Sequence, residues 1–149
     1  MGQAGNAPVA YDRGMKLIRV VLNVLWLVTG GIWLSLGYIL FGLVACIFII
    51  TIPAGVASFR MASYALWPFG RTVVRKPGAG VGSGLMNLVW FVVAGLWLAI
   101  GHIATSIVQA ITVIGLPLAW ANLKMIPVTC FPFGKEIVPD SSAQVIPAP

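Results

Sequence analysis

The sequence predicts an all-α integral membrane protein in which two tandem copies of one segment each form a transmembrane helical hairpin. Three observations lead to this fold class: an excess of apolar residues, an internal repeat, and uncharged runs twice as long as one membrane span. Of 149 residues, 60% are hydrophobic and 8% are charged, whereas soluble domains are about half apolar and a quarter charged. This small number of charged residues cannot cover the surface of a soluble protein of this length. We therefore expect lipid to surround most of the surface of this protein.

The internal repeat relates residues 19–74 to residues 83–138 without a gap, at a constant offset of 64 positions. Tryptophan, proline and the Pro-Phe-Gly triplet recur at this same offset, which chance matches between apolar residues would not produce. These repeat hallmarks are Trp26, Trp33, Pro53, Pro68, Phe69 and Gly70 in the first copy, and Trp90, Trp97, Pro117, Pro132, Phe133 and Gly134 in the second. The chain is therefore predicted to hold two copies of one structural unit.

The repeat divides the chain into five parts. Residues 1–17 form a polar N-terminal tail, 18–74 the first repeat, 75–84 a Gly/Pro-rich linker, 85–138 the second repeat, and 139–149 the C-terminal tail. The glycines, serine and proline of the linker predict a short flexible connection. We expect the two tails to be poorly ordered.

The uncharged run Val20–Phe59 decides how the first copy meets the bilayer. As one straight helix, its 40 residues would be about 60 Å long, twice the ~30 Å hydrocarbon core. Tilt does not absorb a factor of two, so we expect a hairpin that turns at Gly37-Tyr38, and at Gly101-His102 in the second copy. A re-entrant loop that dips into the bilayer without crossing it is the alternative, because glycine and proline interrupt the runs.

The basic residues predict the orientation. Nine lysines and arginines flank the apolar runs, and a single crossing per copy would divide them five to four between the two sides. Two hairpins would keep all nine on one side, as the positive-inside tendency prefers. We therefore expect about four spans, parallel repeats and both termini on the cytoplasmic side of the plasma (inner) membrane.

Each predicted hairpin is followed by a short interfacial segment. Residues 60–67 are aromatic, carry one charge and end at Pro68, which predicts an interfacial helix on the cytoplasmic face. Pro127 predicts a shorter or kinked counterpart in the second copy. The next residues, 71–74 and 135–138, are β-prone and could pair with each other.

Two kinds of hallmark residue have open structural roles. The tryptophans of each copy lie seven residues apart and share one helix face, where they either anchor the helix at the two interfaces or pack between hairpins. Pro53 and Pro117 each remove one helix hydrogen bond, and we expect packing kinks that neighbouring helices satisfy.

The repeated pattern is Asn-x-x-Trp, then Gly-x-Trp-Leu-x-x-Gly, then Ile-Thr-Ile-Pro or Ile-Gly-Leu-Pro, and finally Pro-Phe-Gly followed by Arg or Lys. This pattern resembles the YccF family, also called the inner membrane component domain, in two copies that cover nearly the whole chain outside the tails. The resemblance implies a bacterial-type inner-membrane location with about two spans per copy. It brings no reaction, substrate or catalytic residue.

Few residues in the sequence could carry chemistry. The acids Asp12, Glu136 and Asp140 lie outside the apolar runs, so neither paired carboxylates nor ion-coupling charges are expected at membrane depth. His102 is the only histidine; without metal or triad partners, it fits an interfacial turn. We expect no enzyme activity, no cofactor and no metal ion. Nucleic-acid binding is not expected, because the basic residues flank apolar runs.

Two sets of residues are candidate sites. Asn23 and Asn87 form an intramembrane polar pair, which either holds helices together or lines a polar site or lipid-headgroup pocket that Ser58 and Asn122 extend. The second set would contact anionic lipid or a partner on the cytoplasmic face. Its members are Arg60, Arg71, Lys124 and Lys135.

Two functions fit these features. The first is a non-enzymatic membrane component that contacts the lipid bilayer and anionic lipids and associates with itself or other membrane proteins. The second is a small oligomeric channel or facilitator lined by Asn, Ser, Thr and Gly. We favour the first, because small residues at helix spacing are how helices associate in lipid.

Overall fold

The computed structural model describes residues 9–143, and its first half is one bent helix followed by a returning helix and a strand. The bent helix consists of α1 (Val9–Trp26), η1 (Leu27–Gly31) and α2 (Ile32–Ile47). The short element η2 (Ile49–Thr51) leads into α3 (Ile52–Leu66), and β1 (Arg71–Arg75) follows.

The second half repeats this order. Its bent helix consists of α4 (Val81–Trp90), η3 (Phe91–Gly95) and α5 (Leu96–Ala110), and α6 (Leu116–Cys130) returns along it. The strand β2 (Lys135–Pro139) and the short helix α7 (Asp140–Ala143) end the described part. Residues 9–17, predicted as a polar tail, are therefore helical, and residues 139–143 of the predicted C-terminal tail end β2 and form α7. Residues 1–8 and 144–149 lie outside the described residues.

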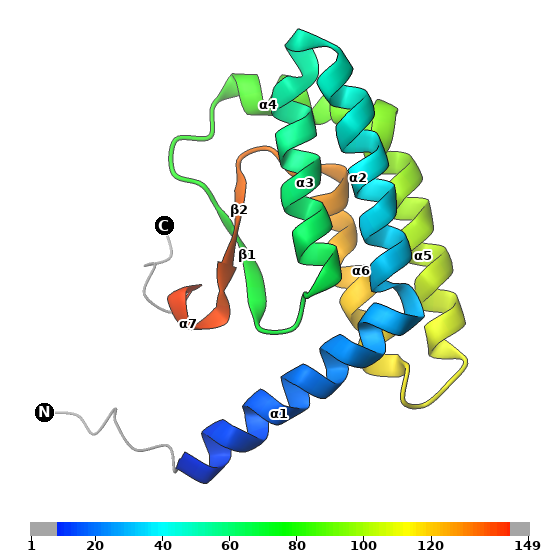
Figure 1. Cartoon of the computed structure of the whole chain (residues 1–149). Coiled ribbons are helices and arrows are strands. Elements are labelled where there is room, and N and C mark those ends of the chain that lie inside the picture. The colour runs from blue at the N-terminus through cyan, green and yellow to red at the C-terminus, as the bar shows by residue number, and fades with distance from the viewer. Residues whose placement is uncertain (1–8, 144–149) are drawn as a thin grey trace, which may run out of the picture.

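Each long helix bends at a π-helical turn, η1 or η3, directly after a hallmark tryptophan. Figure 1 shows α1 leaving α2 at a sharp angle. Such turns interrupt the regular helix ladder and are a known cause of kinks. Glycine is needed there, since a Cβ on Gly31 would lie 2.6 Å from Trp26 Cδ1 and 3.1 Å from the Ala65 carbonyl oxygen. The bend directs α1 away from the hairpin that α2 forms with α3.

The hairpins turn farther along the chain than predicted. Gly37-Tyr38 lies within α2 and Gly101-His102 within α5, whereas the chain reverses at residues 48–51 and 111–115. The prediction halved an uncharged run whose first residues belong to α1, outside the hairpin. Gly37 instead permits close packing, since a Cβ there would lie 3.2 Å from Leu98.

Pro53 and Pro117 begin helices, so the prediction of packing kinks is wrong. Each lies at the first or second position of its helix, α3 or α6, where proline has no intrahelical N–H bond to lose. Pro127 does lie inside α6, yet α3 and α6 are both 15 residues long, so the second copy is not shortened.

The segment predicted as a separate interfacial helix, residues 60–67, continues α3 as far as Leu66. Its buried side chains Met61, Ala62 and Ala65 belong to the main apolar core. Small side chains let α3 approach α2 closely, which explains why the helix does not break at Arg60.

The two hairpins pack against each other through α2 and α5, which run antiparallel. Three close approaches establish this direction: Gly30 to Thr105, Leu34 to Gly101, and Gly37 to Leu98. In Figure 1 the α2–α3 turn accordingly lies at the top and the α5–α6 turn at the bottom. The last two approaches are equivalent in the two copies, so a pseudo-two-fold axis passes between Tyr38 and its counterpart His102.

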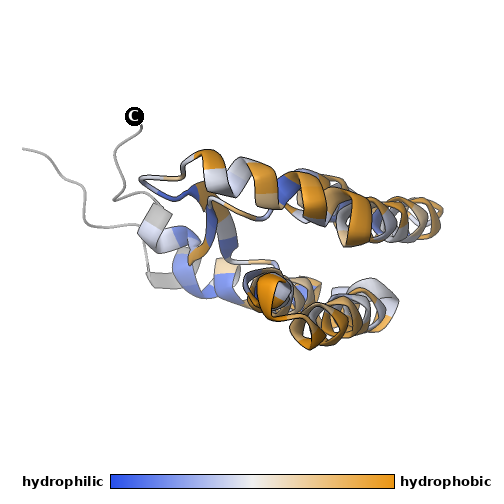
Figure 2. Cartoon of the chain, turned by 90° about the horizontal axis from the view of Figure 1, so that it is seen from above, coloured by the Kyte–Doolittle hydropathy of each residue, from blue (hydrophilic) through white to orange (hydrophobic). Residues whose placement is uncertain are grey.

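The strands β1 and β2 pair with each other in an antiparallel sheet, as the sequence indicated. Val73 lies opposite Ile137, its counterpart in the other copy, so the same axis passes through the middle of the sheet. Figure 2 shows hydrophilic residues around the strands at one end and hydrophobic residues along the helices that extend from it. Charge and apolar surface are thus separated along the axis.

The exterior of the helices is that of a membrane protein. Among residues 9–143, three helical stretches are long and apolar enough, by length and composition, to cross a membrane: Asp12–Ile47, Ile49–Leu66 and Val81–Ala110. The most exposed apolar side chains include those at the two hairpin turns, where Phe48, Ile49, Ile50, Ile111, Val113 and Ile114 are 65–86% exposed. Apolar surface on this scale requires lipid or another protein to cover it.

Candidate functional site

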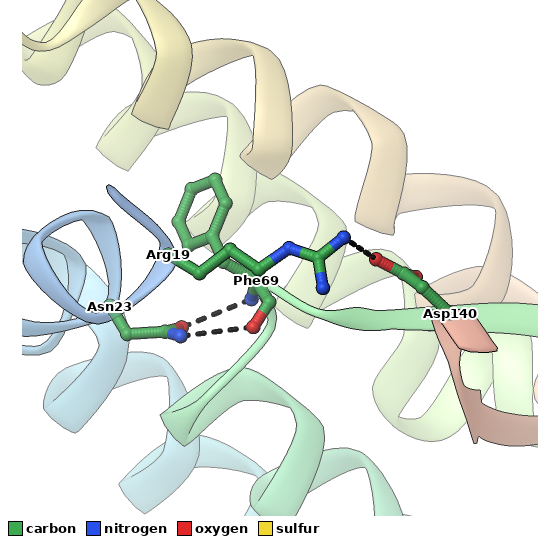
Figure 3. A network of polar contacts seen from close by, with 4 residues as sticks. All are labelled: Arg19, Asn23, Phe69 and Asp140. Carbon is green, nitrogen blue, oxygen red and sulfur yellow. Dashed lines mark hydrogen bonds and ion pairs between the residues drawn. The ribbon is translucent and has the colours of Figure 1, made fainter. Parts of the chain in front are cut away.

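Each hallmark asparagine binds the backbone of the Pro-Phe-Gly loop in its own copy. The Asn23 amide donates to the Phe69 carbonyl and accepts from the Phe69 N–H, both at 3.0 Å (Figure 3). Asn87 makes the same two bonds with Phe133, at 3.1 and 2.9 Å. Asn23 is fully buried and Asn87 is half-buried. Both hydrogen-bonding ends of each amide are therefore engaged within one repeat.

The tryptophan three residues later strengthens this attachment. Trp26 Nε1 donates to the Ala65 carbonyl at 2.6 Å, and Trp90 Nε1 donates to the Thr129 carbonyl at 2.9 Å. The Trp26 and Phe69 rings meet edge to face with centroids 6.1 Å apart, and the second copy has the same arrangement. We call each asparagine and tryptophan, with the loop they hold, a loop latch.

The other two hallmark tryptophans have a different environment. Trp33 is 73% exposed and Trp97 is 60% exposed, on the apolar exterior that lipid would contact. Neither alternative from the sequence describes both members of a pair, because Trp26 and Trp90 pack inside while Trp33 and Trp97 face outward.

The Pro-Phe-Gly triplet recurs because its turn requires those residues. The Arg71 N–H donates to the Pro68 carbonyl at 3.1 Å, which closes a four-residue turn. Gly70 has φ +97° and Gly134 has φ +77°, conformations that a side chain disfavours. The triplet thus reverses the chain from α3 or α6 into the sheet.

Between the copies, four buried polar side chains and the exposed Thr29 form one continuous hydrogen-bonded chain. The Tyr38 hydroxyl lies 3.0 Å from His102 Nε2, and His102 Nδ1 lies 2.7 Å from the Asn122 side-chain oxygen. Asn122 donates to Gln109 Oε1 at 2.6 Å, and Gln109 Nε2 donates to the Thr29 hydroxyl at 2.9 Å. The Asn122 oxygen only accepts, so a neutral His102 carries its proton on Nδ1 and accepts from Tyr38. We call these five residues the polar chain.

The polar chain corrects the prediction for His102, which is fully buried rather than at an interfacial turn. Tyr38 also meets the Thr129 hydroxyl, and Ser58 donates to the Tyr38 carbonyl. At the far end, Thr29 donates to the Leu25 carbonyl. Every buried side-chain nitrogen and oxygen in the described part of the molecule has a partner. The polar chain therefore has hydrogen-bond partners at both ends, and its hydrogen bonds hold the two hairpins together.

The sheet end holds basic side chains at equivalent positions. The Arg71 guanidinium donates to the Ser63 carbonyl at 3.3 Å, and Lys135 Nζ donates to the Pro127 carbonyl at 3.0 Å. Arg75 lies opposite Lys135 in the sheet. Partial burial and the nearby Arg75 charge lower the pKa of Lys135. The sheet end therefore concentrates positive charge in fixed geometry.

Two grooves of similar size flank the sheet. The first has a volume of about 570 Å³ and lies between the start of α3, the second Pro-Phe-Gly loop and residues 76–79; we call it the linker groove. The second has a volume of about 480 Å³ and lies between the start of α6, the first loop and Asp140; we call it the Asp140 groove. They are counterparts in the two copies.

The grooves bring together the basic residues that the sequence singled out. Arg60 and Lys135 line the linker groove, and their counterparts Lys124 and Arg71 line the Asp140 groove. Asn23 and Asn87 line neither groove. Each groove therefore combines basic residues from both copies, and the two members of each equivalent pair lie in different grooves.

Sequence reasoning missed the polar chain and one groove residue, Lys76. The sequence held one signal for the polar chain. Tyr38 and His102 occupy equivalent positions in the middle of uncharged runs, and such a pair can lie where the two repeats pack against each other. For Lys76 the local sequence gave no signal, because its position in a groove depends on the other copy's loop. Within residues 9–143, no cluster of His, Cys, Asp or Glu could hold a metal ion.

Comparisons with known proteins agree with the repeat. A family model described as the inner membrane component domain, YccF, matches residues 21–71 and 85–135. The inner membrane protein YccF of Escherichia coli (strain K12) is 33% identical over 136 residues, which cover 85% of this chain and 92% of that protein. The protein of the same name from Shigella flexneri shows the same identity and coverage. No solved structure matches the chain significantly.

Proposed function

Because the chain belongs to the YccF family, the family of the inner membrane component domain, we propose that it is a non-enzymatic component of the bacterial inner membrane. Its working surface in this proposal is the basic sheet end, exposed at the cytoplasmic face. One observation carries the proposal: the charged sheet lies at one end of the pseudo-two-fold axis and the apolar helices extend from it.

The charges favour one orientation of this axis in the bilayer. With the axis in the membrane plane, the middle of the sheet would lie at mid-depth, where each lysine or arginine costs at least about 2.5–3.5 kcal/mol. With the axis along the membrane normal, the sheet lies in the cytoplasmic headgroup region, as the positive-inside tendency prefers. The repeats are then parallel in the membrane sense, although α2 and α5 run antiparallel.

Helix length and turn chemistry favour re-entrant hairpins over four full spans. The helices α2, α3, α5 and α6 have 15 or 16 residues, which gives about 22–24 Å against a ~30 Å hydrocarbon core. The turns satisfy their own carbonyls, since Thr51 bonds with Ala45 and Phe48, and Thr112 bonds with Gln109. Because α2 and α5 run antiparallel across the axis, they lie close to the membrane plane when the axis is along its normal. We therefore infer that each hairpin stays in the cytoplasmic half of the bilayer and returns to the cytoplasmic side without crossing.

The described residues give little support to catalysis or conduction. The one histidine, His102, is enclosed in the polar chain with no carboxylate. The channel alternative relied on Asn23 and Asn87 to line a route, and both amides bond to loop backbone instead. A structural or interaction role needs neither a catalytic group nor a polar route through the protein. It also fits a chain in which, among the described residues, every buried polar side-chain atom has a hydrogen-bond partner.

Cysteine accessibility tests the proposed placement. Cys46 and Cys130 are first replaced by alanine, and Ile50→Cys, Gly80→Cys or Val113→Cys is introduced singly. A membrane-impermeant maleimide is then applied from each side. We expect position 80 to react only from the cytoplasmic side and the two turn positions from neither. Reaction of a turn from the periplasmic side would refute re-entrant hairpins, and reaction of position 80 from that side would refute the placement of the sheet end.

Association is tested by cross-linking the full chain in its native membrane and purifying it in mild detergent. We expect products that contain a second copy or another membrane protein, because the small-residue helix faces and the basic end are surfaces for association. A strictly monomeric chain without cross-linked partners would contradict the proposed role.

A further inference from the structure

The two grooves are equivalent in position but differ in charge. Lys76 of the linker groove is the counterpart of Asp140, and Ser83 is the counterpart of Arg19, at the same offset of 64 residues. Arg19 and Asp140 form an ion pair at 3.1 Å (Figure 3). Asp140 lines its groove together with the cations Arg71 and Lys124, whereas the linker groove has a third cation, Lys76, at the equivalent position.

The positive charge of the linker groove is therefore not offset. Arg60, Lys76 and Lys135 line it, and no acidic residue does. The Lys135 ammonium is held by the Pro127 carbonyl at 3.0 Å, and the Ser83 hydroxyl belongs to the same lining. Three cations and a hydroxyl around one space suit a phosphate group, which accepts hydrogen bonds from all of them.

One wall of the linker groove is apolar and continues onto the exterior of α3. Ile52, Pro53 and Val56 form this wall, and Ile52 and Val56 are 42% and 52% exposed. A ligand that fits both parts has a phosphate group joined to a hydrocarbon chain. The volume of about 570 Å³ is within the range of roughly 300–1,000 Å³ found for small-molecule sites.

We propose that the linker groove binds the phosphodiester headgroup of an anionic phospholipid, with an acyl chain along Ile52 and Val56. Arg60, Lys76 and Lys135 contact the phosphate. A zwitterionic headgroup fits less well, because its ammonium group meets the same basic side chains. This inference rests on the proposed location of the sheet end in the cytoplasmic headgroup region.

Lipid retention by the full chain tests the assignment. The protein is purified in micelles that contain phosphatidylglycerol or phosphatidylcholine, and bound lipid is measured by native mass spectrometry. Lys76→Asp places in the linker groove the same residue type as its counterpart, Asp140. The substitution lowers the charge of the groove by two units, and each unit is worth roughly a factor of five in affinity. We expect phosphatidylglycerol retention to fall roughly 30-fold. The matched control, Lys124→Asp, makes the same charge change in the Asp140 groove and is expected to alter retention less than threefold.

Several results would overturn the assignment. Equal losses in the two variants would mean that net charge alone matters, and no loss in Lys76→Asp would mean that the lipid binds elsewhere. Equal retention of the two lipids would remove the preference for an anionic headgroup. Displacement of the lipid by an equal concentration of inorganic phosphate would identify a free-anion site. If retention fails while position 80 still reacts from the cytoplasmic side, only the groove assignment is lost.

Discussion

Replacing Asn23 with leucine tests whether the loop latch stabilises the fold. The variant loses both hydrogen bonds to Phe69 and leaves that residue's N–H and carbonyl against an apolar side chain. Each unsatisfied buried group costs about 1–3 kcal/mol. Phe69 is half-buried, so the lower part of that range applies and the free energy of unfolding should fall by about 2–4 kcal/mol. Leucine is close to asparagine in size, so little of this loss comes from a cavity.

The second copy supplies a matched control for this variant. Asn87→Leu removes the same two bonds to Phe133, but Asn87 is half-buried, and solvent or headgroups can reach the freed groups. The expected loss is therefore smaller, about 1–2 kcal/mol. Unfolding is measured by SDS titration in mixed micelles and followed by tryptophan fluorescence, since the latch tryptophans Trp26 and Trp90 contact the two loops.

Two results would refute this reasoning. If Asn23→Leu were as stable as the unmodified chain, the latch would contribute nothing measurable to stability. If Asn87→Leu lost more stability than Asn23→Leu, burial would not decide the cost of the missing bonds.

Two further variants use the same unfolding assay. Tyr38→Phe removes the hydroxyl that His102 meets at 3.0 Å and should cost about 1–3 kcal/mol; an unchanged midpoint would show that the polar chain does not fasten the hairpins. Gly70→Ala adds a side chain at φ +97° and should cost about 1–2 kcal/mol. Gly80→Ala, with no atom within 4 Å of the added Cβ, is its control and should be neutral.

The repeat, the apolar exterior and the pairing of the strands were predictable because each depends on residue identity along the chain. The positions of the hairpin turns were not predictable, because the length of an uncharged run does not show where within it the chain turns. The bend at Trp26 lies at a π-helical turn, next to an indole that donates to the Ala65 carbonyl 39 residues farther along the chain. That contact belongs to the tertiary structure.

The candidate residues divide in the same way. The asparagines and basic residues could be identified because they are polar exceptions beside or within apolar runs. Their partners could not, because Arg60 and Lys135 share a groove only through the antiparallel packing of the hairpins. Local sequence does not encode the direction in which one repeat packs on another, so the two grooves and their unequal charges could not be foreseen.

The contact between Tyr38 and His102 lies where two related halves meet. In an assembly of two identical chains, the residue on such an axis must bind a copy of itself, and one side chain must serve as donor and acceptor at once. Joining both halves in one polypeptide removes that restriction, so a hydroxyl can face an unprotonated ring nitrogen. The covalent link between the halves thus allows a strong, directional contact at the one position where perfect symmetry would forbid it.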